Sequence, residues 1–174
     1  MRAGALARSF RSALFVGVSS PPFLEAGLRD PFSVLAQVAE RDADGGASPR
    51  VCTAVSVATE NAVEGCVGET WAALLAAWQA ESSEDPELRS TMRALAVEEA
   101  RNAQHAWCVA AWLDGMLDER DRTKVRAARD QAVLDLEREI AEGGAYAEGD
   151  ALLGLPSATQ ARALLRELCT SLWK

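Results

Sequence analysis

The chain has 174 residues, of which 49% are hydrophobic, and a formal net charge of −8 at pH 7. A chain of this length and composition can bury one hydrophobic core, so we expect one main folded domain. The excess of acidic residues argues against a nucleic-acid partner, because phosphate contacts require clustered Lys and Arg.

Residues 1–50 are predicted to form an N-terminal segment, partly irregular, with short helices. Spaced arginines precede an apolar run over 13–18 that is shorter than the core of a usual signal peptide. We favour an amphipathic helix ended by Pro21-Pro22, with a secretory signal as the alternative, and a short helix over 32–39. No apolar run approaches the roughly 20 residues that span a membrane. We therefore expect a cytoplasmic protein, with a secreted or periplasmic location left open.

A long helix is predicted from about residue 50 to about residue 81. Residues that recur at steps of three and four are predicted to share one of its faces: Glu60, Glu64, Val67, Trp71, Leu74 and Trp78. Gly65 and Gly68 lie in the same stretch and indicate close packing against a neighbouring helix.

A second long helix is predicted from Asp85-Pro86, an N-cap followed by proline in the first turn, to about Leu113, with Gly115 as a break. Its predicted face has the same periodicity: Leu88, Met92, Leu95, Glu99, Asn102, Ala106, Val109 and Leu113. The connection is so short that the two helices must pack antiparallel. The register of the turn places Glu64, Glu99 and Asn102 together inside the apolar interface. A carboxylate buried there must be protonated, hydrogen-bonded or bound to a cation.

Residues 118–142 are predicted to form an amphipathic surface helix with an apolar stripe: Val125, Ala128, Ala132, Leu136 and Ile140. A loop over 143–155 tucks onto the bundle, and Ser157 caps a last helix. The inward residues of that helix are Ala161, Leu164, Leu165, Leu168 and Leu172. The cysteines (Cys52, Cys66, Cys108 and Cys169) lack zinc-site spacing and are predicted to be reduced thiols. Residues 51–174 are thus predicted to be one all-α domain.

The segments VEGCVGETWAALLAAWQA, EDPELR and LAVEEARNAQHAWCVAAWL resemble the second half of bacterial ferritin-like domains. The resemblance covers residues 55–113 and, more loosely, 155–173. Such domains are four-helix bundles that hold a di-iron or di-manganese centre with lone Glu residues and Glu-x-x-His motifs. The resemblance implies a ferritin-like helical bundle built on a long antiparallel helix hairpin. It places Glu64 at the lone-Glu position, with Glu69 as a second candidate, and Glu99 at the Glu of Glu-x-x-His.

This sequence departs from that pattern in its histidines and in its first half. Asn102 stands where the motif has His, and an amide is a poor transition-metal ligand. The single histidine of the chain, His105, falls about 120° around the helix from Glu99. The other Glu helix and the other Glu-x-x-His helix have no counterpart before residue 55.

Two functional hypotheses follow. The first is a degenerate ferritin-like domain with a scaffold or interaction role and an incomplete metal site. The second is carboxylate-bridged binding of iron or manganese at a homodimer interface through Glu64 and Glu99, with oxidase or iron-handling activity. Asn102 would be a further donor there, and the weaker candidates are Glu60, Glu69 and His105. Oxygen donors also suit Mn²⁺, Mg²⁺ or Ca²⁺. Enzymatic activity stays open, including acid–base chemistry by the carboxyl pair without a metal.

Overall fold

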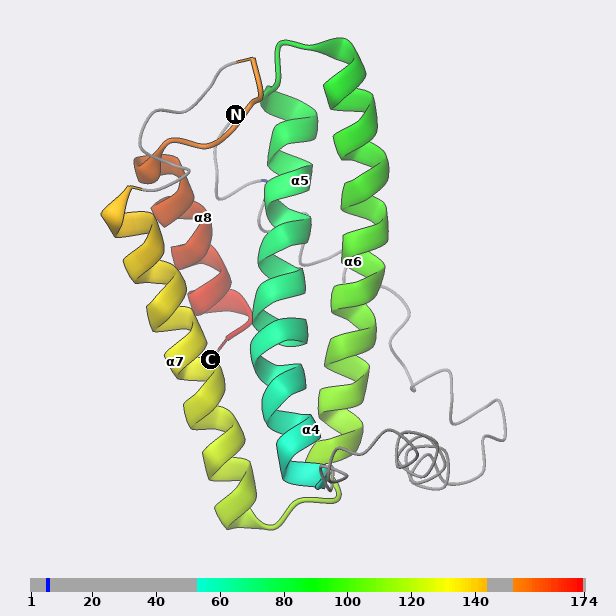
Figure 1. Ribbon diagram of the computed structural model, residues 1–174, viewed down its shortest axis with the longest axis vertical. Helices are drawn as coiled ribbons and strands as arrows, with labels where there is room; N and C mark the ends of the chain where they lie inside the picture. Colours follow the sequence, from blue (N-terminus) through cyan, green and yellow to red (C-terminus); the bar gives the residue numbers. More distant parts are fainter. Residues whose placement is uncertain (1–5, 7–52, 144–151, 174) are drawn as a thin grey trace, which may run out of the picture.

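The computed structural model describes Leu6, residues 53–143 and residues 152–173, and the regular structure in those ranges is entirely helical (Figure 1). The elements in chain order are α4 (Ala54–Glu60), the π-helix η2 (Asn61–Glu69), α5 (Thr70–Ser82), α6 (Pro86–Asp114), α7 (Glu119–Glu142) and α8 (Ala158–Ser171). The prediction of an all-α fold is confirmed. The predicted helices before residue 50, the Pro21-Pro22 break and Cys52 lie outside the described residues, apart from Leu6 itself.

The first predicted helix is a continuous rod, residues 54–82, whose middle third is π-helical. It begins at Thr53, whose side chain accepts a hydrogen bond from the backbone N–H of Ser56. The π-helical stretch was not predicted. Because a π turn holds more residues than an α turn, it changes which residues point inward.

That change explains why only part of the predicted face of this rod is buried. Four apolar residues of the predicted face are buried as predicted. They are Val67, near the end of the π-helical stretch, and Trp71, Leu74 and Trp78, which follow it. Glu60 and Glu64 were predicted to share this face but are exposed. In their place the sequence buries small residues at four-residue steps: Ala58, Ala62 and Cys66.

Helix α6 runs antiparallel to the rod, as the short connection predicts (Figure 1). The Oδ1 atom of Asp85 accepts hydrogen bonds from the backbone N–H groups of Glu87 at 2.8 Å and Leu88 at 3.3 Å, which confirms the predicted N-cap. The helix ends at Asp114, next to the predicted break at Gly115. Its first half, residues 86–102, is fully described and contains no buried residue. Burial begins only at Ala103.

Helices α7 and α8 close the core on the side of the rod away from α6 (Figure 1). The predicted caps Asp118 and Ser157 both accept backbone hydrogen bonds, and Ser157 forms a full capping box with Gln160. The main core cluster combines residues of the rod, α6, α7 and α8: Val67, Trp71, Ala73, Leu74, Trp78, Ala103, Ile140, Ala161, Leu164, Leu165, Leu168 and Trp173. Among the helices in the described ranges, none combines the length and apolar character needed to cross a membrane.

The segment before α8 is fastened to the turn between α5 and α6. The Ser83 hydroxyl donates to the carbonyl oxygen of Leu152 at 2.6 Å, and the Gln79 amide donates to that of Leu153 at 3.1 Å. Gly154 has a φ of 67°, and a Cβ there would lie 2.3 Å from the backbone nitrogen of Ser83. Only glycine fits both restrictions. The predicted packing of this loop onto the bundle is confirmed for its described part.

We predict that Trp71→Ala lowers the free energy of unfolding by about 3–5 kcal/mol, because it removes a buried indole and leaves a cavity. Trp71 is 6% exposed in the main core cluster. Trp112→Ala is the matched control, since Trp112 is only partly buried in the smaller cluster around Leu113 and should show a clearly smaller loss. Denaturant melts followed by circular dichroism measure both, and equal losses would contradict the proposed core.

Candidate functional site

Three polar side chains meet across the η2–α6 boundary, and we call them the acidic cluster: Glu69, Glu99 and Asn102. Glu69 is the last residue of η2, whereas Glu99 and Asn102 lie one turn apart on α6. The Nδ2 atom of Asn102 donates to Oε2 of Glu99 at 3.4 Å. The Glu69 carboxyl group hydrogen-bonds with both Glu99 and Asn102. The cluster therefore joins the two long helices of the hairpin.

The pKa of the Glu69 carboxyl is raised above its ordinary value of 4.5. The largest cause is the hydrogen bond with Glu99, which requires a proton between the two carboxyl groups. Desolvation and the charges of Glu99 and Glu64 raise the pKa further, while the hydrogen bond with Asn102 lowers it. The arrangement is thus suited to hold a proton between Glu69 and Glu99.

The predicted burial of the central site residues is wrong. Glu64 and Asn102 are exposed, and Glu99 is half-buried. Glu69, the second candidate for the lone-Glu position, is half-buried and lies opposite Glu99 in the place predicted for Glu64. The π-helical stretch is the physical reason, because it shifts the helix phase that the 3.6-residue period assumes.

The two weakest candidates do not join the cluster. Glu60 is exposed at the end of α4 and lines a separate surface groove with Glu64. His105 is exposed on α6. Within the described residues, no group of three or more His, Cys, Asp or Glu side chains could hold a metal ion. The donors in this part of the chain do not match the Glu and Glu-x-x-His ligand set of ferritin-like domains.

The contact between the helices next to the cluster is not predictable from the residue pattern. The Nδ2 atom of Asn61 donates to the backbone carbonyl of Ala106 at 2.9 Å. A Cβ on Gly65 would lie 2.6 Å from the Cβ of Ala106, so the expected close packing at this glycine is confirmed. Gly68, in contrast, is exposed and has room for a side chain. We call the contact between Asn61, Gly65 and Ala106 the glycine seam.

A cavity lined by Cys66 offers no reactive group. The cavity, of about 110 Å³, lies between α4, η2, α6 and α7, and is lined by Cys66 and arginines of α7. Burial raises the pKa of the Cys66 thiol to about 12, so the thiol stays protonated and is a poor nucleophile. Arg126 pairs with Glu119 at 2.6 Å and Arg129 with Asp130 at 3.1 Å. The described cysteines Cys66, Cys108 and Cys169 are free thiols, as predicted.

Comparison of the chain with protein families, with curated proteins and with solved structures gives no match.

The raised pKa of Glu69 predicts a pH-dependent stability. A carboxyl whose folded pKa is raised stabilises the fold below its unfolded pKa, and that contribution is lost as pH rises through the folded value. The free energy of unfolding should therefore decline as pH rises through the window that begins near 4.5.

Glu69→Gln should weaken this decline and stabilise the protein at pH 7. Solvent screens the partly exposed pair, so we expect a gain of about 0.2–1 kcal/mol. Glu60→Gln is the control, because Glu60 is exposed outside the cluster and its replacement should change nothing. Denaturant melts at several pH values test this, and a loss of stability at pH 7 in Glu69→Gln would show that both carboxylates are ionised and partnered.

Proposed function

We propose that the chain is a degenerate ferritin-like domain with a scaffold or interaction role. The observation that carries this proposal is the exposed first half of α6, in which no residue of 86–102 is buried. Leu95 there is 36% exposed. A long helix that presents an apolar side chain to solvent is suited to contact a partner.

The chemistry of the acidic cluster supports the scaffold role over metal handling. Its two carboxyl groups engage each other and Asn102, and the residue one turn after Glu99 is an amide instead of an imidazole. Amide oxygen is a weak donor for iron. His105 lies outside the cluster on the same helix.

A second candidate function is carboxylate-bridged binding of iron or manganese between two copies of the chain. The observation in its favour is that Glu99 and the charge of Glu64 both act on the Glu69 carboxyl at a partly exposed site. A second copy placed against this site would double the carboxylates. Each copy would then supply Glu64 and Glu99 as metal ligands, and Glu69 would be a further ligand.

Metal titration distinguishes the two functions. Calorimetry with Fe²⁺, under anaerobic conditions, and with Mn²⁺ is carried out on the parent chain and on Asn102→His, which restores the Glu-x-x-His motif. Gln104→His is the matched control, since it adds an imidazole to the same helix, α6, but outside the acidic cluster.

In the scaffold role, the parent and both variants bind with Kd weaker than about 1 mM, or about −4 kcal/mol. Tight binding by the parent, accompanied by a doubled mass in solution, would overturn the scaffold role. Tight binding by Asn102→His but not by Gln104→His would show a latent metal site at Glu99.

A further inference from the structure

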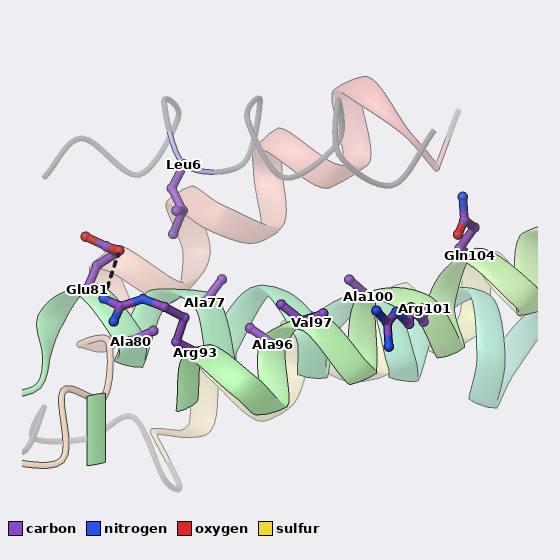
Figure 2. Close-up of a pocket in the computed structure, with 10 residues that line it drawn as sticks. All are labelled: Leu6, Ala77, Ala80, Glu81, Arg93, Ala96, Val97, Ala100, Arg101 and Gln104. Carbon is purple, nitrogen blue, oxygen red and sulfur yellow. Dashed lines mark ion pairs between the residues drawn. The ribbon is translucent and has the colours of Figure 1, made fainter. Parts of the chain in front are cut away.

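An apolar groove of about 400 Å³ follows the side of the α5–α6 hairpin (Figure 2). Ala77 of α5 and Ala96 and Ala100 of α6 are among its lining residues, together with Val97. Small side chains on two adjacent helices leave a channel into which the side chains of a third helix can insert. Glu81 and Arg93 form an ion pair of 3.9 Å at one end.

Leu6 also lines this groove, opposite the hairpin residues. It is in helical conformation and half-buried, and it packs against the main core cluster. Figure 2 shows its side chain pointing from the N-terminal segment toward Ala77 and the hairpin. The groove therefore already has an apolar residue from far away in the sequence seated on it.

The sequence around Leu6 places an apolar stripe along one side of a helix. At about 100° per residue, six of its apolar and small residues fall within an arc of about 100°: Ala3, Leu6, Phe10, Ala13, Leu14 and Gly17. Arg8, Arg11 and Ser12 fall on the opposite side. Leu6 thus belongs to a continuous stripe that matches the apolar lining of the groove.

The same chain can supply this segment without a second copy. At about 1.5 Å per residue, the helical rod from Thr53 to Ala77 measures roughly 36 Å. Residues 7–52 connect Leu6 to Thr53, and a chain of that length can extend well beyond this distance.

We propose that the groove between α5 and α6 is the docking site of the chain's own N-terminal segment, residues 3–17. Leu6 and Phe10 are the anchors, in the manner of an amphipathic helix that lays its apolar face into a hydrophobic groove. No residue of the acidic cluster lines this groove. Docking is independent of whether the chain binds metal.

Hydrogen exchange of the full-length chain, followed by mass spectrometry over residues 77–104, tests the proposal. Leu6→Asp and Phe10→Asp place a charge in the stripe and should each speed exchange in this region several-fold. Phe15→Asp is the matched control, because Phe15 falls on the opposite side of the helical pattern and its replacement should leave exchange unchanged. Equal effects of Phe10→Asp and Phe15→Asp would overturn the proposal.

Val97→Asp changes the groove side of the same contact. Combined with Leu6→Asp it should speed exchange no more than the stronger single change, because both remove one interaction. Additive effects would overturn the proposal. The exchange of the parent should also be independent of protein concentration. Protection that grows with concentration, together with a doubled mass, would show that a second copy occupies the groove instead.

Discussion

A Cβ on Gly65 would lie 2.6 Å from the Cβ of Ala106 and 2.9 Å from the Oδ1 of Asn61. The two long helices therefore approach each other so closely at position 65 that only glycine fits there. The Asn61 amide binds the Ala106 carbonyl across the same point, at 2.9 Å. Two indole N–H groups donate hydrogen bonds beside it, that of Trp107 to the Thr70 hydroxyl and that of Trp173 to the carbonyl of Cys66, each at 3.2 Å. The glycine seam therefore fixes the register of the hairpin, and the indoles tie α6 and the C-terminal residues to it.

This register decides what the hairpin can do. It sets Glu69, and not Glu64, against Glu99 on a partly exposed surface, where the hydrogen bond with Glu99 raises the pKa of the Glu69 carboxyl. From Ala103 onward, buried residues of α6 pack against the rod, whereas before Ala103 the helix has no buried residue. That half of α6 carries the surface we propose for a partner, and on its other side it lines the groove that Leu6 also lines. The glycine seam thus lies in the half of α6 that has buried residues, next to the half that has none.

The sequence was sufficient for the features that depend on local chemistry. The caps at Asp85 and Ser157, the break at Gly115 and the apolar stripe ending at Ile140 all follow from the residue types present. The position of Glu64 did not follow, because a period of 3.6 residues assumes an uninterrupted α-helix. No residue type signals a π-helical stretch. Gly65 and Gly68 both indicate close helix packing in the sequence. Only the structure shows that Gly65 is in close contact with the neighbouring helix and that Gly68 is not.

The direct test of the glycine seam is the free energy of unfolding of Gly65→Ala and Gly68→Ala. The account predicts that Gly65→Ala is destabilised by about 1–3 kcal/mol through overpacking. Gly68→Ala, where a Cβ meets nothing closer than 3.7 Å, should be neutral or stabilised by about 0.5–1 kcal/mol, the usual gain over glycine in a helix. Adding Ala106→Gly to Gly65→Ala should restore part of the loss by removing the opposing Cβ. Equal effects of the two alanine substitutions, or no recovery with Ala106→Gly, would contradict the account.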